Sequence, residues 1–341
     1  MTQKKALRSM KNYLEQLRSG QLLFGLFVLF CLLLILRNTE IAMESMSRGL
    51  ALCAKTVIPS LFPFMVISEM IVLGGFGGAV IKRLCAPLCR LLRLNPDGCC
   101  AALLGILCGF PIGVRSATLS YEEGRITKRD AERILCFSSN PSSAFLVSAV
   151  GASLWGNVKF GIALYASVLL SAILIGIFLA QIASDPPCKE MPKHDSNSTS
   201  AHLSPPQLFC QSIRSALGSI LLVCAYVVFF SALVGTFNFM PGVQKLPSSA
   251  QAFLFCFFEL SCGMSQAAAL SSPHIAAMLC AFAAGWSGVS VHCQALSLCE
   301  KSRLSLRPYL FAKAAQAILT PLLLGILIGL FPNLLIPATL G

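Results

Sequence analysis

The sequence predicts an all-α, polytopic integral membrane protein: a helical bundle with two regions of broken or re-entrant helix and an internal repeat. Hydrophobic residues make up 56% of the 341 residues and charged residues only 12%, and the mean hydropathy is +0.76. A soluble domain has about a quarter charged residues, so this excess of apolar side chains indicates burial in lipid. Long apolar runs recur along the chain, and several are interrupted by glycine, proline or polar residues.

The basic residues indicate how the chain lies in the membrane. The formal net charge is +12, a value that is by itself compatible with nucleic-acid binding. The lysines and arginines, however, lie in short clusters beside apolar runs, which is the placement that fixes membrane topology and contacts anionic lipid. The predicted partner is therefore the lipid bilayer, and nucleic-acid binding is not predicted.

The composition divides the chain into four regions. Basic residues dominate 1–20, a hydrophilic linker occupies 184–207, and the two membrane halves are 21–183 and 208–341. The apolar run 21–36 resembles a signal peptide but has no small-residue cleavage site after it. We expect it to remain as the first helix of a protein in the inner (plasma) membrane, with the N-terminus in the cytoplasm.

Apolar runs predict the other membrane segments. They are residues 50–74, 98–116, 134–155 and 160–183 in the first half, and 208–237, 250–270, 275–298 and 309–331 in the second. Residues 121–133 balance four acidic against four basic side chains and predict a helix lying on the membrane surface. Glu69 and Arg115 lie near the ends of apolar runs, where long charged side chains extend to the membrane surface. The alternative for Arg115, which follows an interruption, is contact with an anionic group.

Two apolar runs contain residues that weaken a helix. Gly109, Pro111 and Gly113 fall within the stretch 105–115, and proline leaves a carbonyl without its donor. A second such stretch, 285–292, lies in the other half of the chain. In lipid a broken backbone survives only against protein or around a water-filled cavity. Interrupted segments in corresponding halves therefore indicate a transporter-type binding site.

Similarity between the interrupted segments predicts the internal repeat. Gly109-Phe-Pro-Ile-Gly-Val and Gly285-Trp-Ser-Gly-Val share two glycines, an aromatic residue and a valine, and the sequence leaves open whether the repeat is parallel or inverted. A third interruption is the run of six non-apolar residues at 138–143. The segments 98–116 and 134–155 either both cross the membrane or both return as re-entrant hairpins. The four basic residues between them favour re-entry from the inside.

Two ionisable residues within apolar runs are candidates for function. Glu259 lies near the middle of a predicted helix, where a carboxylate costs several kcal/mol unless it is paired or protonated. The alternative is a structural hydrogen bond to a neighbouring helix. His292 shares a predicted helical face with Gly285 and Gly288, which would let a ligand come close to the imidazole. The alternative is a packed histidine bonded to a backbone carbonyl.

The predicted solute-binding set joins these two residues to the glycine, proline and uncharged polar residues of the interrupted segments. Such groups suit a neutral polar ligand, and the dipoles of half-helices can receive an ion. The set is Gly109, Pro111, Gly113, Ser138, Asn140, Glu259, Ser287, Ser290, His292 and Gln294.

An enzymatic function is not predicted. Gly285-Trp-Ser287-Gly288 matches the G-x-S-G of rhomboid-type intramembrane serine proteases, whose serine needs a histidine from a later helix. No histidine follows His292, which belongs to the same predicted helix. Most of the sixteen cysteines lie within apolar runs, and neither C-x-x-C nor H-E-x-x-H occurs. No catalytic residue, metal site or cofactor is therefore predicted.

Four motifs occur in order along the chain. They are Gly109-Phe-Pro-Ile-Gly-Val-Arg115, Ser139-Asn-Pro-Ser-Ser-Ala-Phe145, Glu259 with Gly263, and Gly285-Trp-Ser-Gly-Val-Ser-Val-His-Cys-Gln294. These motifs resemble those of the YlbJ-type sporulation integral membrane proteins, which belong with the nucleoside-recognition (Gate) domain proteins of spore-forming bacteria. The resemblance covers nearly the whole chain. The second motif departs from the family pattern, because Ser142 and Ser143 stand where the family has a Gly-Pro pair and Ser139 where it has asparagine.

The resemblance implies a multi-pass membrane protein of endospore formation, linked to assembly of the spore cortex, with a fold distantly like that of concentrative nucleoside transporters. The first hypothesis is a transporter or exporter of a small polar solute, nucleoside-like or spore-related. The second is a non-transporting membrane protein that acts as a structural or partner-recruiting component and binds other sporulation membrane proteins. The chain contains no soluble domain large enough to act as a scaffold module, which favours transport.

Overall fold

The computed structural model describes residues 19–75, 77, 86–183 and 204–335, and within these ranges every regular element is a helix. Most of the basic N-terminal region, most of the linker and the C-terminal six residues lie outside the described residues. The predictions made for the first two of these regions are therefore not addressed by the structure.

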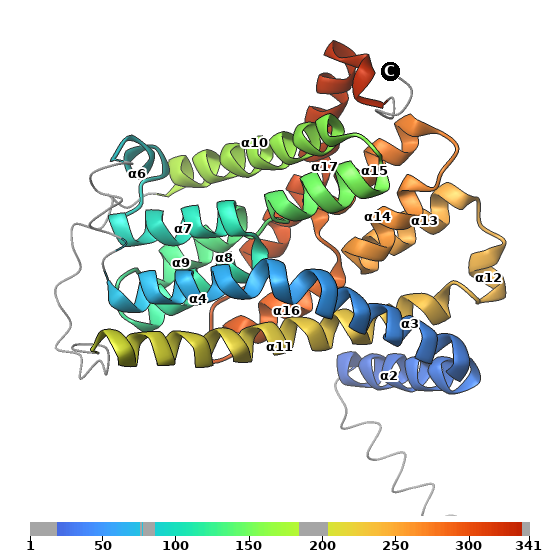
Figure 1. The fold of residues 1–341 in the computed structure, drawn as a ribbon, viewed down its shortest axis with the longest axis horizontal. Helices are drawn as coiled ribbons and strands as arrows, with labels where there is room; N and C mark the ends of the chain where they lie inside the picture. The colour runs from blue at the N-terminus through green and yellow to red at the C-terminus, as the bar shows by residue number, and fades with distance from the viewer. Residues whose placement is uncertain (1–18, 76, 78–85, 184–203, 336–341) are drawn as a thin grey trace, which may run out of the picture.

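The helices follow one another in a bundle that is elongated in one direction (Figure 1). The first half contains α2 (Ser19–Arg37), α3 (Thr39–Leu52), the π-helix η1 (Cys53–Val57), α4 (Ile58–Gly74), α6 (Ala86–Leu92), α7 (Pro96–Cys108), α8 (Phe110–Glu122), α9 (Lys128–Ser138), the π-helix η2 (Phe145–Leu154) and α10 (Val158–Ile182). The second half contains α11 (Pro205–Phe237), α12 (Pro241–Gln244), α13 (Ser248–Phe258), α14 (Leu260–Ala268), α15 (Pro273–Trp286), α16 (Val289–Cys299), α17 (Arg307–Leu330) and the 3-10 helix η3 (Pro332–Leu335).

The predicted multi-pass helical fold is confirmed. In the described part of the chain, four segments are long and apolar enough to cross a membrane: α10, α11, α17 and the pair α15–α16 (Pro273–Cys299). Two bent pairs, α2 with α3 and α6 with α7, raise the number to six if each is one span. The shortest of the four, α17, has 24 residues and a length of about 36 Å at 1.5 Å per residue, which exceeds the hydrocarbon core of a bilayer.

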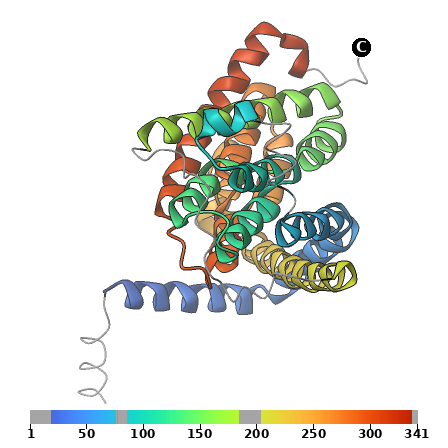
Figure 2. The same cartoon turned by 90° about the vertical axis from the view of Figure 1, so that its left-hand side faces the viewer.

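The N-terminal helices differ from the prediction in where the second one begins. The predicted run 50–74 is the later part of a kinked helix that starts at Thr39, includes η1 and ends with α4. The π-helix lies directly before Pro59, which has no N–H to continue an α-helical ladder. This long helix packs along α11, while α2 bends away from it by 98°. Figure 2 shows α2 crossing below the bundle, and its side chains are nearly all exposed.

Two helix pairs turn back on themselves as hairpins. Helices α7 and α8 pack side by side on either side of Gly109, and Gly105 faces Gly113 so closely that a Cβ on Gly105 would lie 2.5 Å from the Gly113 Cα. Helices α13 and α14 pack in the same way, with Gly263 against the backbone of Cys256. Helices of 9 to 13 residues are about 14–20 Å long, too short to cross a bilayer. Both pairs have the dimensions of re-entrant segments.

Two other segments are interrupted but continue onward. Helix α9 ends at Ser138 and η2 begins at Phe145, and both pack along α10 rather than against each other. The first half therefore combines one hairpin with one broken span, whereas the sequence favoured two hairpins. The predicted surface helix at 121–133 is instead the end of α8, a turn and the first part of α9, because Gly124 adopts a φ of 68° and Thr127 caps the start of α9.

The order of elements is repeated in the two halves. Each contains a long helix, a hairpin, a broken span and a continuous span: α3–α4, α7–α8, α9–η2 and α10 in one, and α11, α13–α14, α15–α16 and α17 in the other. The hairpins enter from opposite ends of the bundle with their tips toward the middle (Figure 1), so the arrangement is inverted. The two similar sequences at Gly109 and Gly285, which predicted the repeat, do not occupy equivalent positions in the two halves. Gly109 is a hairpin tip, and Gly285 belongs to a broken span.

A polar layer separates two apolar cores along α10 and α17. One core includes Ile175 of α10 and Tyr309 of α17, and the other includes Val168 of α10 and Leu324 of α17. Between these positions both helices bury polar side chains. They are Ser171, Lys313, Gln316 and Thr320, each with no exposed surface.

Candidate functional site

A cavity of about 370 Å³ lies where the two hairpin tips meet the two broken spans. Its walls come from both halves of the chain and include the long helices α4 and α11. The lining residues are Leu52, Val57, Leu61, Gly109, Phe110, Pro111, Pro141, Ser142, Ala144, Phe145, Ser148, Ala149, Ser153, Val223, Val227, Glu259, Leu260, Ser261, Val291 and Gln294. Among these, Glu259 is the one charged residue.

The first hairpin tip needs a glycine for two reasons. Gly109 adopts a φ of 102°, a conformation that residues with a side chain rarely adopt. A Cβ at this position would also lie 2.9 Å from the Cβ of Ser142 in the break of α9–η2. Pro111 follows in the first turn of α8, where its missing N–H has no helical partner to lose. Both residues line the cavity, so the first motif closes one side of it.

The second hairpin tip places a carboxylate on the cavity. Glu259 has an extended backbone and ends α13, so it does not lie in the middle of a helix as the sequence predicted. Its Oε2 accepts a hydrogen bond of 2.7 Å from the N–H of Cys262 and thereby caps α14. The Cys262 thiol interacts with the same carboxylate, and the described residues give Glu259 no ion pair. The carboxylate therefore lines the cavity without a cationic partner in the described part of the chain.

The broken span α15–α16 brings a second acceptor to the same cavity. Gln294 lies on α16 and is 2% exposed. Its Nε2 donates to the hydroxyl of Ser290 over 3.2 Å, and its Oε1 has no partner. Ser290 itself does not line the cavity. Glu259 and Gln294 thus give a largely apolar cavity a carboxylate and an amide oxygen without a partner, which suit a solute that donates hydrogen bonds.

His292 lies beside the cavity but does not line it. The helix breaks at 287–288, where Ser287 has a φ of 73° and Gly288 a φ of 87°, so Gly285 and His292 belong to different helices and share no face. The predicted common face was wrong because the break ends the helical repeat. His292 Nδ1 forms a hydrogen bond of 2.9 Å with the Tyr309 hydroxyl rather than with a carbonyl. His292 Nε2 and the Ser287 hydroxyl are buried without a partner.

Three further predicted residues lie away from the cavity, in the first half. Gly113 packs against Gly105 and the carbonyl of Ser138, and the Ser138 hydroxyl is buried without a partner. Asn140 joins the polar layer, where its Oδ1 accepts from Gln316 Nε2 over 2.8 Å. The structure therefore brings Gly109, Pro111, Glu259 and Gln294 to one cavity, and places the other six predicted residues around it.

Sequence reasoning missed the residues of α17 in the polar layer. Lys313 is fully buried and donates to the Ser139 carbonyl, to Asn140 Oδ1 and to Gln316 Oε1 over 2.9, 3.4 and 2.8 Å. A signal was available, because Lys313, Gln316 and Thr320 recur at spacings of three and four within an apolar run.

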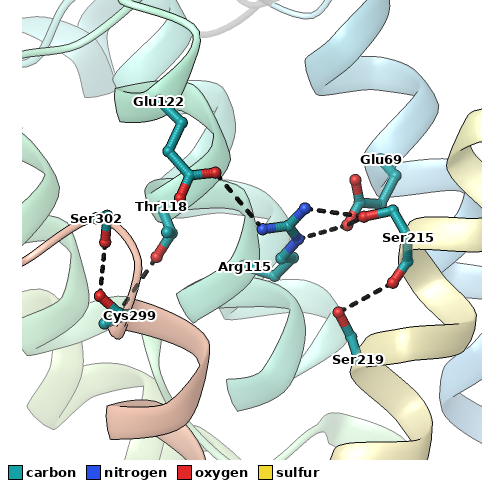
Figure 3. A network of polar contacts seen from close by, with 8 residues as sticks. All are labelled: Glu69, Arg115, Thr118, Glu122, Ser215, Ser219, Cys299 and Ser302. Carbon is teal, nitrogen blue, oxygen red and sulfur yellow. Dashed lines mark hydrogen bonds and ion pairs between the residues drawn. The ribbon is translucent and has the colours of Figure 1, made fainter.

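An ion pair ties the first hairpin to both long helices. Arg115 Nε lies 2.7 Å from Glu69 Oε1, and the Ser215 hydroxyl bonds to both side chains (Figure 3). Glu122 approaches the same guanidinium at 3.7 Å. The prediction that Glu69 and Arg115 extend to the membrane surface was wrong for Glu69, which is 2% exposed, because it has a cationic partner inside the protein.

These features define the class to which the protein belongs. The protein is a multi-pass helical membrane protein in which two hairpins and two discontinuous helices surround a central cavity.

The chain is similar to a known membrane protein. The chain is 21% identical over 335 residues to the sporulation integral membrane protein YlbJ of Bacillus subtilis (strain 168), and the match covers 87% of this chain and 80% of the relative. This similarity over most of both chains confirms the resemblance carried by the four motifs. No family model matches the chain, and no solved structure matches it.

Proposed function

We propose that this protein acts in endospore formation as a transporter or exporter of a small polar solute across the plasma membrane, with its N-terminus in the cytoplasm. The relative from Bacillus subtilis is by name a sporulation integral membrane protein, which supports the sporulation role. Transport is supported by the inverted order of elements, because inverted repeats with discontinuous helices are the construction of many secondary transporters.

The observation that carries the proposal is the cavity between the hairpin tips. Segments that are interrupted in lipid need polar partners, and here four such segments end around one space of about 370 Å³. This volume lies within the range of small-molecule sites, about 300–1,000 Å³. Gln294 presents an acceptor without a partner and Glu259 a carboxylate to this space, and Ser142, Ser148 and Ser261 add hydroxyls. A nucleoside-like solute, rich in hydroxyl and amino donors, fits this chemistry.

Thermal stability of the purified protein with candidate solutes tests the proposal. The panel contains nucleosides, nucleobases, dipicolinate and cell-wall precursors. A solute at about 100 times its Kd stabilises the folded state by about 2.7 kcal/mol, which raises the apparent melting temperature in a saturable way. We expect a donor-rich neutral solute to produce this shift and the dianionic dipicolinate to produce none, because Glu259 repels it.

Matched variants locate the site. Glu259→Gln and Gln294→Leu are expected to lose most of the shift, whereas Gln244→Leu, which changes an exposed amide outside the cavity, retains it. Uptake of the same solute into proteoliposomes then tests movement across the bilayer. If no solute shifts the wild-type protein, transport through this cavity is contradicted. The alternative is then a non-transporting component that recruits sporulation membrane proteins.

A further inference from the structure

Lys313 occupies an unusual position for a lysine. It lies in the second turn of α17, has no exposed surface, and reaches the break that follows α9. None of the ion pairs formed by the described residues includes it. A buried ammonium without a carboxylate needs another source of negative potential, because removing it from water is otherwise costly.

The atoms around the Lys313 nitrogen are all oxygens that accept. The Ser139 carbonyl can only accept a hydrogen bond. The Asn140 amide is oriented by its Nδ2, which donates to the Phe137 carbonyl over 2.7 Å, so its Oδ1 faces the lysine. Gln316 is oriented in the same way, because its Nε2 donates to the Val168 carbonyl and to Asn140 Oδ1.

This arrangement fits the ammonium form of the lysine. Three acceptors surround the nitrogen at 2.8–3.4 Å, and an ammonium has three N–H donors, whereas a neutral amine has two donors and one lone pair. The Ser139 carbonyl also lies at the C-terminal end of α9, where the helix dipole favours positive charge.

A shell of backbone carbonyl and amide oxygens at an interrupted helix is the environment in which membrane proteins coordinate monovalent cations. We propose that the break after α9 is a monovalent-cation site whose cation is supplied by the chain itself, the ammonium of Lys313. The residues that surround the Lys313 nitrogen, Ser139, Asn140 and Gln316, do not line the central cavity, whereas Pro141 and Ser142 of the same break do. It follows that the wild-type break needs no free Na⁺, and that removing the lysine side chain leaves a vacant site for one.

The test compares two variants in three salts. Lys313→Ala leaves space beside the oxygens, and Lys313→Met fills that space with apolar atoms. Apparent melting temperatures are measured for the detergent-purified proteins in NaCl, KCl and choline chloride at equal ionic strength. We expect the wild-type protein to have the same apparent melting temperature in all three salts. Lys313→Ala is expected to melt several degrees lower in choline chloride and to regain most of the loss in NaCl with a saturable dependence.

The control is Lys313→Met, which is expected to melt below the wild type and to gain nothing from Na⁺ over choline. Two results overturn the proposal. One is a Lys313→Met protein as stable as the wild type, because the positive charge is then not needed. The other is a Lys313→Ala protein that behaves identically in the three salts, whether it folds in all of them or in none. Neither result depends on solute binding, so this experiment and the test of the proposed transport function are independent of each other.

Discussion

The break in the first half, at 139–143, and the break in the second half, at 287–288, interrupt spans at corresponding places but differ in what fills them. At the first, Lys313 and Gln316 of α17 bond to Asn140 and to the Ser139 carbonyl. At the second, the Oε1 of Gln294 and the Nε2 of His292 have no partner, and the Glu259 carboxylate lines the adjoining cavity.

The difference shows that an interrupted helix can serve two purposes. An interrupted helix exposes polar groups that must be satisfied in a membrane. Where other residues of the chain form hydrogen bonds with these polar groups, the break contributes to the stability of the fold. Where it leaves acceptors facing a cavity, the break can bind a ligand. We therefore expect substitutions at the first break to affect mainly stability, and substitutions at the second to affect mainly binding.

The largest expected effect comes from removing the shared acceptor of the first break. Asn140→Leu leaves the donors of Lys313 and Gln316 short of a buried partner and is expected to lower the free energy of unfolding by about 3–5 kcal/mol. Gln294→Leu, at the second break, is expected to cost less than about 1 kcal/mol, since it removes one side-chain hydrogen bond and an acceptor that has no partner. Apparent melting temperatures of the two purified variants test the contrast, which fails if both fall equally.

Disrupting the ion pair of the first hairpin should have the second-largest effect on the free energy of unfolding. In the described part of the chain no ion pair involves α13 or α14, whereas Arg115 of α8 is paired with Glu69 of α4. Glu69→Ala is expected to cost about 2–3 kcal/mol, because it leaves a half-buried guanidinium with only the more distant Glu122. A double-mutant cycle with Arg115→Met checks this. Recovery of part of the loss in the double variant indicates a direct pair, and simple additivity contradicts it.

Substituting a glycine in either hairpin should lower stability by a similar amount, so the two halves do not differ in this respect. Gly105→Ala and Gly263→Ala each place a methyl group against the backbone of the facing helix and are expected to cost about 1–3 kcal/mol. Gly218→Ala in α11 is the matched control, because no atom lies within 4 Å of the added Cβ. It should be neutral or slightly stabilising. Equal melting temperatures for all three variants would contradict the close packing of the hairpins.

The smallest effect is expected at the edge of the second break. Tyr309→Phe removes the hydroxyl that bonds to His292 Nδ1 and should lower the free energy of unfolding by about 1 kcal/mol. Solute binding should change little, since neither residue lines the cavity. Melting curves with and without solute separate the two quantities, and a lost solute shift with unchanged stability would place His292 in the binding site instead.

The local pattern of the sequence determined most of the helices. Continuous apolar runs predicted α10, α11 and α17 to within three residues at each end, since hydropathy and length are local properties. Glycine and proline also marked the interruptions at Gly109 and at 287–288, because their backbone preferences do not depend on distant contacts. The predicted solute-binding set included four residues that line the cavity, Gly109, Pro111, Glu259 and Gln294.

Tertiary structure alone decided how the interruptions are used. A hairpin and a broken span have similar local sequences, and the outcome depends on whether the two parts can pack together, as they do where Gly105 meets Gly113. The same holds for Glu259, whose position at a tip rather than in a helix depends on the packing of Gly263 against Cys256.

The partners in long-range polar contacts could not be predicted from the local sequence. Lys313 bonds to Asn140 across 173 residues, and Arg115 bonds to Ser215 across 100. The sequence by itself determined that polar groups interrupt the membrane helices of this protein. Which of them satisfy one another and which face a cavity follows only from the fold, because a hydrogen bond needs atoms within about 3 Å, and chain spacing does not specify that distance between separate helices.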